Sequence, residues 1–279
     1  MIKIEEHKLI DPDGKLKISF QETPNVSGPF NSGLPDTIII HYTAGSSLKS
    51  SASWLQNPKA KASAHLVVGK TGEIIQLAPF NVRTWHAGRS SWKGRSGLNQ
   101  YSIGIEIDNA GPLTQTPDGY MTHFSKLVDN KNVVLAKHKL DSNECGWEAY
   151  TPQQIELVEE ICLALREVYG INEIAGHDDI APSRKRDPGP AFPMNSLRGK
   201  VLFGRNEDLP DEPEDLPDDL AIVVADNLNI RSTPVINASL VSNPLPKGTK
   251  VKIVKSQGGW SYVIADIEGW VSNQWLHTV

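Results

Sequence analysis

The sequence has only two cysteines and no long apolar stretch. Cys145 and Cys162 are too few for a disulfide framework in a chain of 279 residues. We expect Cys162, which lies in an apolar helical pattern, to be buried, and Cys145 to be an unreactive thiol in a loop. No run approaches the roughly 18 apolar residues that a membrane-spanning helix requires. The sequence therefore predicts neither a disulfide scaffold nor a membrane span.

An apolar leader is also absent from the start of the given sequence. The first ten residues, MIKIEEHKLI, are charged and contain no apolar core of the signal-peptide type. This predicts a protein that stays in the cytoplasm or leaves it by a non-standard route. A chain whose signal peptide had been removed would begin in the same way, so the localisation stays open.

An excess of charge of one sign is confined to one segment. Residues 205–220, RNEDLPDEPEDLPDDL, contain eight acidic residues, one arginine and three prolines, whereas the whole chain has a net charge of −5. Such a self-repelling, proline-containing stretch predicts an extended linker. Residues 1–204 hold 22 basic and 22 acidic side chains, and residues 221–279 hold five and three. Neither part has the basic excess of a nucleic-acid-binding protein. We predict two domains, 1–204 and 221–279, joined by this linker.

The first domain alternates strand patterns with helical ones. The β-branched run TIIIH predicts a buried strand that ends at His41. A short helix is predicted over 47–55, and a hairpin that turns at residues 70–72 over 63–79. In the strand predicted over 100–109, Glu106 lies on the face opposite three isoleucines, and burying a glutamate there is costly without a partner or a task. These patterns predict an α/β domain with a central mixed β-sheet flanked by helices.

The clearest helix is predicted over 152–169. Thr151 and Gln154 form a capping-box pattern, Pro152 suits the first helical position, and Gly170 ends the helix. One face carries the apolar residues Ile155, Val158, Ile161, Cys162, Leu165 and Val168. The preceding region, 109–150, has no clean period and is predicted to be a long insertion, either a substrate-facing loop or surface decoration.

A rigid segment follows this helix, GHDDIAPSRKRDPGP, with His177 at its start and Asp187 ten residues later. A catalytic zinc site has three protein ligands, and histidine and carboxylate groups suit this ion. His41, at a strand end, is a third candidate. The sequence contains no HExxH motif, and a single histidine is more often an ordinary core or surface group. Spacing alone therefore does not establish a metal site.

Five motifs together resemble one known family. In chain order they are IIIHYTAG, ASAHLVVGKTGEIIQLAPF, TWHAG, YSIGIEIDN and GHDDIAPSRKRDPGPAF. Over roughly residues 36–193 the chain resembles the type 2 N-acetylmuramoyl-L-alanine amidases, whose fold is shared with the peptidoglycan recognition proteins. The resemblance implies hydrolysis of the amide bond between N-acetylmuramic acid and L-alanine, in peptidoglycan or in soluble muropeptides.

The resemblance also implies a role for individual residues. It implies one zinc ion per chain, with His41, His177 and Asp187 as ligands. Glu106 matches the catalytic acid/base, and Lys185 matches the lysine near the attacked carbonyl. The resemblance also implies a substrate contact for three further residues, His86, Trp85 and His65. The alternative for His65 is that it is only a polar residue on a strand near the cleft, without a substrate contact.

A second function remains open within this resemblance. Some relatives of this fold bind peptidoglycan without cutting it, having lost a metal ligand. The aspartate at position 187, together with Glu106 and Lys185, argues against that alternative here. The sequence gives no indication of the oligomeric state.

The last 59 residues resemble a bacterial SH3-like domain, a small all-β barrel, through the pattern NLNIRSTP, GGWSYV, GWV and WL. Such modules commonly bind cell-wall peptidoglycan, but this one could instead pack on the first domain and shape its cleft. Trp260, Trp270 and Trp275 are either its core or part of a binding surface. Val251 and Ile253 are expected on one side of a strand.

Overall fold

The computed structural model describes residues 2–203, 220–225, 227–235, 238–257, 260–265, 268–272 and 276–278. The chain divides into two compact units, Met1–Asn206 and Glu207–Val279, each with its own hydrophobic core. The predicted acidic linker lies outside the described residues except for Leu220. Its boundaries stay predictions.

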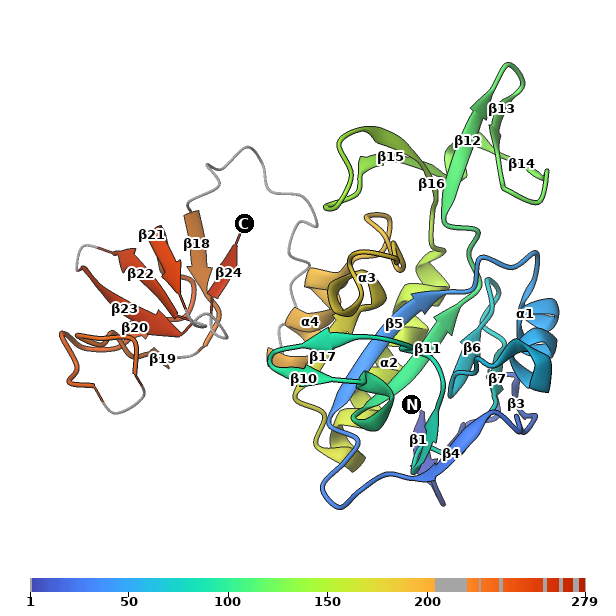
Figure 1. Ribbon diagram of the computed structural model, residues 1–279, viewed down its shortest axis with the longest axis horizontal. Coiled ribbons are helices and arrows are strands. Elements are labelled where there is room, and N and C mark those ends of the chain that lie inside the picture. The colour runs from blue at the N-terminus through green and yellow to red at the C-terminus, as the bar shows by residue number, and fades with distance from the viewer. Residues whose placement is uncertain are drawn as a thin grey trace. The chain divides into compact units, whose positions relative to one another are not determined.

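The first unit is built on a six-stranded mixed sheet, as predicted (Figure 1). The strand order is β17 (Glu173–Gly176), β5 (Thr37–Tyr42), β11 (Ser102–Ile107), β6 (Leu66–Val68), β7 (Ile74–Gln76) and β3 (Ile18–Phe20). The first four strands run parallel to their neighbours, β6 and β7 form the predicted antiparallel hairpin, and β3 is parallel to β7. Parallel strands present their carboxyl ends at a common edge, where ligands of open α/β sheets commonly bind.

Three helices of eight or more residues flank this sheet: α1 (Leu48–Gln56), α2 (Pro152–Tyr169) and α4 (Met194–Phe203). Helix α2 has the predicted bounds, and both hydrogen bonds of its capping box are present. Gly170 ends it in the left-handed conformation, at φ 69°. Its predicted apolar face is wrong at Val168, which is 51% exposed, whereas the next residue, Tyr169, packs against the core.

The two faces of the sheet have different covers. Ile38, Ile40 and the isoleucines of β11 pack with α2 and α4 in the main core. Ile39 faces the other side, where it packs with Ala87 and Leu98. On that same side α1 covers Val67 of β6. The strand pattern thus leaves the even-numbered residues of β11 facing away from α2.

Shorter elements complete the first unit. They are the strands β1 (Lys3–Glu5), β2 (Lys8–Ile10), β4 (Val26–Pro29), β8 (Val82–Thr84), β9 (Ser91–Trp92) and β10 (Arg95–Ser96), the one-turn helix α3 (His177–Ile180), and 3-10 turns at Pro58–Ala60, Leu98–Gln100 and Asn130–Asn132.

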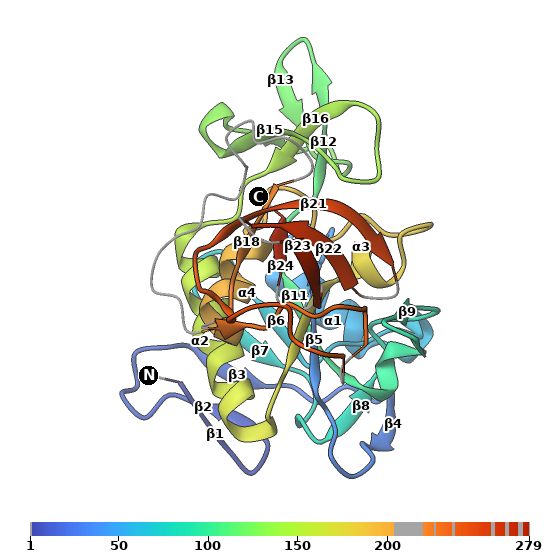
Figure 2. The same cartoon turned by 90° about the vertical axis from the view of Figure 1, so that its left-hand side faces the viewer.

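The insertion at 109–150 is an ordered antiparallel sheet, which the sequence did not predict. Its strand order is β14 (Leu127–Val128), β13 (Gly119–Met121), β12 (Pro112–Thr116), β16 (Glu144–Glu148) and β15 (Val133–Lys137). Figures 1 and 2 show it beyond the edge of the central sheet at which β11 ends. Leu127 and Leu135 are more than half exposed, so the apolar residues of these strands do not all lie on a buried face. The alternation of apolar and polar residues by which strands are normally predicted is therefore missing here. Cys145 lies in β16 and not in a loop, whereas Cys162 is fully buried as predicted.

The second unit is an all-β domain, as predicted. Its five-stranded sheet has the order β23 (Glu268–Ser272), β22 (Trp260–Ile264), β21 (Lys250–Gln257), β18 (Leu220–Val223) and β24 (Leu276–Thr278), and β19 (Asn227–Leu228) pairs with β20 (Leu245–Pro246). Val251 is buried in its core and Ile253 packs against it. Trp260 is partly buried, Trp275 lies outside the described residues, and of Trp270 only the backbone is described.

Candidate metal centre

The sheet places a histidine and a glutamate side by side. His41, near the end of β5, is the register partner of Glu106 on β11. Partners on parallel strands project to the same face of a sheet. This is the face turned away from α2. His177 is the first residue after β17, the strand on the other side of β5, so three neighbouring strands bring polar side chains to one edge.

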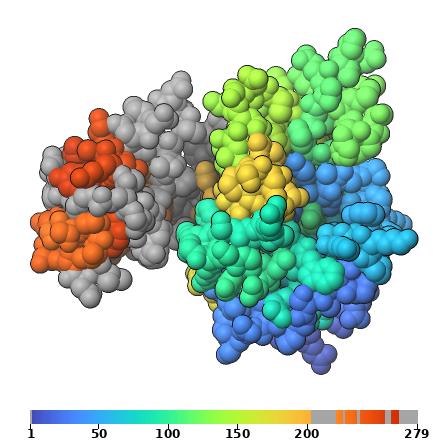
Figure 3. Space-filling view, in the orientation of Figure 1, coloured from blue at the N-terminus to red at the C-terminus, as the bar shows by residue number. Residues whose placement is uncertain are grey.

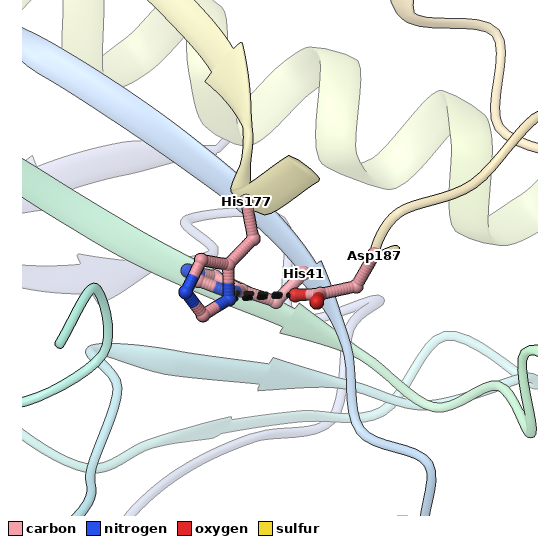
Figure 4. A group of neighbouring side chains, drawn as sticks. All are labelled: His41, His177 and Asp187. Carbon is pink, nitrogen blue, oxygen red and sulfur yellow. Dashed lines mark hydrogen bonds and ion pairs between the residues drawn. The ribbon is translucent and has the colours of Figure 1, made fainter. Parts of the chain in front are cut away.

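Three predicted ligand atoms meet at this edge (Figure 4). The Nδ1 atoms of His41 and His177 are 2.8 Å apart, and each lies 2.9 Å from Oδ2 of Asp187. All three residues are buried. Their side chains form the only cluster of three or more possible ligands found among the described residues. The structure therefore joins residues that are separated by up to 146 positions in the sequence.

The other ring nitrogens of the two histidines are occupied by the protein. His41 Nε2 lies 3.0 Å from Nδ1 of His86, and His177 Nε2 lies 3.3 Å from the carbonyl oxygen of Ala87. Burial lowers the pKa of His41 to about 4, and a charge on His177 would lower it further, against the opposing effect of Asp187. Burial raises the pKa of Asp187, but the neighbouring His177 and His41 outweigh it and keep this pKa below its usual range. A neutral imidazole and an ionised carboxylate are the forms that bind a metal.

The loop that carries Asp187 is held by its backbone. The amide of Asp178 donates to the carbonyl of Asp187 over 2.8 Å. The Tyr150 hydroxyl donates to the carbonyl of Pro188 over 2.8 Å. Gly189 has a positive φ of 75°, and a Cβ there would lie 2.6 Å from the ring of Trp147. The backbone is therefore fixed at Asp187 and at the two residues that follow it.

Glu106 lies beside this cluster as a carboxyl group without a hydrogen-bond partner. Its Oε2 atom is buried and makes no hydrogen bond within the described residues. Burial raises the pKa of Glu106 well above its usual value, the negative charge of Asp187 raises it further, and Lys185 opposes both. Lys185 is partly buried and also lowers the pKa of His41, so its charge acts on both residues. A strongly shifted carboxyl group beside a possible metal site is typical of catalytic centres.

The insertion is joined to the ligand loop (residues 177–192) by contacts that the sequence did not reveal. His138, the first residue after β15, lies 2.9 Å from Asp178 Oδ2, and both residues are buried. Lys139 pairs with Asp178 at 3.0 Å, and Arg186 of the loop donates to Asp141 over 2.9 Å. In Figure 3 the loop (yellow) lies between the insertion (yellow-green) and the segment near residues 90–100 (teal). In the sequence, only the two adjacent aspartates of GHDD could have suggested that the ligand loop contacts basic residues elsewhere.

The three residues for which we predicted a substrate contact have different surroundings in the structure. His65 is fully buried, and its Nε2 lies 2.8 Å from the carbonyl of Val82. Its Nδ1 accepts from the amide of Gly104 over 3.0 Å, so the ring has no open side for a ligand. His86 is also buried, and its Nδ1 atom is within hydrogen-bond distance of Nε2 of His41. Trp85 is half-buried and donates from Nε1 to Ser27 over 2.6 Å. A substrate contact stays a prediction for all three, and the geometry supports it least for His65.

None of the helices in the described part of the chain is long and apolar enough to cross a membrane.

Comparison with known proteins gives two family matches. The family described as N-acetylmuramoyl-L-alanine amidase matches residues 31–190, and the bacterial SH3 domain matches residues 226–277. The first match includes every residue that we predicted as a metal ligand or catalytic group. The two matched segments lie in different compact units of the structure.

Several curated proteins are similar to the first segment. "1,6-anhydro-N-acetylmuramyl-L-alanine amidase AmpD" of Citrobacter freundii is 33% identical over 149 residues, which cover 53% of this chain and 62% of the relative. "N-acetylmuramoyl-L-alanine amidase AmiD" of Escherichia coli is 33% identical over 168 residues, 57% of this chain and 51% of that protein. "N-acetylmuramoyl-L-alanine amidase A" of Achromobacter lyticus is 38% identical, over 60% of this chain and 83% of that protein.

Among solved structures, that of a selenomethionine derivative of AmpD matches 71% of this chain and 98% of its own, with 26% identity and a TM-score of 0.49. The chain spans less than two thirds of the length of the AmpD proteins that it matches. The family match nevertheless extends over more than half of the present chain. The chain therefore belongs to the N-acetylmuramoyl-L-alanine amidase family, and a bacterial SH3 domain follows the amidase segment.

Proposed function

We propose that this protein is a zinc-dependent amidase that hydrolyses the bond between N-acetylmuramic acid and L-alanine. The observation that carries the proposal is the meeting of His41 Nδ1, His177 Nδ1 and Asp187 Oδ2 beside the strand that carries Glu106, whose Oε2 atom is buried. Two histidines and one carboxylate are a known ligand set of catalytic zinc, which leaves a coordination position for water.

The donor atoms suit a cation. When both rings carry their proton on Nε2, three lone pairs converge without a proton between them, and a positive ion stabilises such an arrangement. His41, His177 and Asp187 would hold one zinc per chain. When bound, zinc acts as a Lewis acid that polarises a carbonyl group and makes water acidic enough to serve as a nucleophile near neutral pH.

Glu106 and Lys185 supply the remaining chemistry. Glu106 lies next to His41 in the sheet register, where its carboxylate would accept a proton from water and return it to the leaving amine of L-alanine. The positive charge of a nearby metal would offset the charge of Asp187 and favour ionised Glu106. Lys185 would stabilise the negative charge that develops on the attacked carbonyl oxygen. The backbone hydrogen bonds of the ligand loop hold Lys185 and Asp187 in place before the reaction.

The substrate belongs to the peptidoglycan class. Relatives are named for N-acetylmuramoyl-L-alanine and for its 1,6-anhydro form. We propose that the amidase unit cleaves such muropeptides and that the SH3 unit binds the polymeric cell wall or contributes to the cleft. Action on the intact wall requires a route out of the cytoplasm, whereas action on soluble fragments does not.

One experiment tests the activity and the substrate together. The zinc-loaded full chain is incubated with whole sacculi and, in parallel, with purified anhydromuropeptides, and the products are identified by mass spectrometry. Free stem peptides that begin with L-alanine support the proposal, and the faster of the two reactions identifies the preferred form. Binding to sacculi without any release of peptide, by a protein that carries zinc, would instead establish a non-catalytic binding protein.

A further inference from the structure

His86 is held between a carbonyl oxygen and His41. Its Nε2 atom lies 3.1 Å from the backbone carbonyl of Ser102, and its Nδ1 atom lies 3.0 Å from Nε2 of His41. A carbonyl oxygen only accepts hydrogen bonds. The nearby hydroxyl of Ser102, 3.2 Å from the same Nε2, has already donated its proton to the carbonyl of Leu98 over 2.6 Å. Both neighbours of His86 Nε2 therefore require a donor, and this nitrogen carries the proton.

The position of that proton determines the next hydrogen bond. A neutral imidazole has one N–H, so His86 Nδ1 presents a lone pair. His86 is buried between the rings of His41 and His65, whose centroids lie 5.2 and 6.1 Å away, and such surroundings disfavour a charged ring. His41 must then donate from Nε2 to His86. Its own Nδ1 is left as a lone pair that faces His177 and Asp187.

The backbone of β11 makes room for this arrangement at one residue. Gly104 lies under the ring of His86, and a Cβ at this position would be 2.4 Å from Cγ of His86. Gly104 does not have a positive φ, so its backbone conformation does not require glycine. The absence of a side chain matters here because it lets the ring of His86 approach closely. Any larger residue would push His86 away from His41.

We propose that His86 is a positioning residue of the metal centre, which fixes the Nε2–H tautomer of His41 through a relay anchored on the carbonyl of Ser102. This inference rests on the proposed zinc site and gives His86 a role different from substrate contact. Groups that hold the second nitrogen of a ligand histidine typically raise metal affinity by about 10- to 100-fold. Here a second histidine does this, and its Nδ1 can accept from His41 only while its own proton is on Nε2 and is donated to Ser102.

Three variants of the relay test it on the full chain. The zinc dissociation constant is measured by competition with a chromophoric chelator at fixed pH. His86→Phe fills the space without a hydrogen bond, and zinc binding should weaken by about 10- to 100-fold. His86→Asn places an amide oxygen near the position of Nδ1 and should recover most of the affinity. Gly104→Ala keeps His86 but displaces it, and should weaken binding as well.

Thr23 provides the control. It is buried, and its hydroxyl donates to the carbonyl of Leu55 over 2.7 Å, whereas none of its hydrogen bonds within the described residues joins it to the relay or to a proposed ligand. Thr23→Val should lower the melting temperature of the zinc-free protein and leave the zinc dissociation constant unchanged. Unchanged affinity in His86→Phe, or an equal loss in His86→Phe and Thr23→Val, would overturn the proposal.

A second measurement needs no variant and no zinc. Long-range proton–nitrogen NMR spectra of the zinc-free wild type report which ring nitrogen carries the proton. We expect Nε2–H for both His41 and His86, and Nδ1–H on His41 would overturn the relay. If the wild type bound no zinc, the proposed function would fail, while this spectrum would still decide the tautomer of His41.

Discussion

Glu106 and His41 are register partners on adjacent parallel strands, and their side chains leave the sheet on the same face. Neighbouring strands lie about 4.8 Å apart, so this pairing alone brings a carboxyl group beside a metal ligand. No hydrogen bond within the described residues holds Glu106 Oε2, and its raised pKa reflects the cost of burying it. A carboxyl group with a raised pKa beside a possible metal site is typical of catalytic centres, and this is the role that we propose for Glu106.

Replacing Glu106 with glutamine should separate chemistry from metal binding. Glu106→Gln keeps the shape of the side chain but removes its ability to accept a proton. We expect zinc content to be retained and turnover of anhydromuropeptide to fall by about 100-fold or more. The melting temperature should stay the same or rise, because the surroundings of Glu106 disfavour a negative charge that glutamine does not carry. Turnover at the wild-type rate would make Glu106 a structural residue.

The ligand set predicts stoichiometric zinc. Purified protein should contain about one zinc per chain by elemental analysis, and chelation should abolish activity. His177→Ala should lose both the metal and turnover, because two ligands bind zinc far more weakly than three. His123 is exposed and distant from the cluster in the sequence, and His123→Ala should keep both. A metal-free enzyme with full activity would refute the assignment.

The pair of His138 and Asp178 should stabilise the fold. Both residues are buried, so His138→Ala removes a hydrogen bond to the Asp178 carboxylate and leaves that carboxylate with Lys139. We expect the free energy of unfolding to fall by about 1 to 3 kcal/mol, the cost of taking a hydrogen-bond partner from a buried polar group. Lys137, the preceding residue, is exposed, and Lys137→Ala should change the free energy of unfolding by less than about 0.5 kcal/mol. Chemical denaturation of the zinc-free protein measures both, and equal losses would contradict the pairing.

Burial of His65 should make the zinc-free protein sensitive to acid. Burial lowers the pKa of His65 from 6.5 to about 4 in the folded state. Between these values the unfolded chain binds the proton more readily, so this contribution is complete above pH 6.5 and is lost as the pH falls to about 4. The difference corresponds to on the order of 3 kcal/mol. Unfolding measured with denaturant across this range should show a shallower pH dependence in His65→Gln, and identical slopes would argue against a buried neutral ring.

Removal of residues 221–279 should affect insoluble and soluble substrates differently. All proposed ligands and catalytic groups precede this segment, and it has a separate core. A chain cut near residue 205 should therefore retain zinc and cleave small muropeptides, but lose retention on sacculi. Because the segment holds only five basic and three acidic residues, its binding should depend weakly on salt. Co-sedimentation with sacculi at low and high salt measures this, and loss of activity on small muropeptides would instead mean that the SH3 unit completes the cleft.

Local sequence determined the framework of the site. Helix α2 begins and ends where Thr151 and Gly170 predict, because capping depends on neighbours in the chain. The strand pattern likewise places His41 near a strand end and Glu106 on the face opposite the isoleucines of β11. The motifs supplied the family and the three candidate ligands. Each of these inferences needs only residues that are close in sequence or a pattern that is already known.

The tertiary structure decided what lies behind the ligands. No local pattern shows that His86 meets His41 across 45 residues, or that its ring needs Gly104 beneath it. The same holds for His138 and Asp178, which lie 40 residues apart, and for the sheet of the insertion, whose exposed Leu127 and Leu135 obscure any alternation. Side chains on separate elements meet only after the chain has packed, and a buried hydrogen bond is then specified by the position of its partner and not by sequence distance. For this protein the sequence therefore determined which residues could bind the metal, and packing decided which nitrogen of His41 is offered to it.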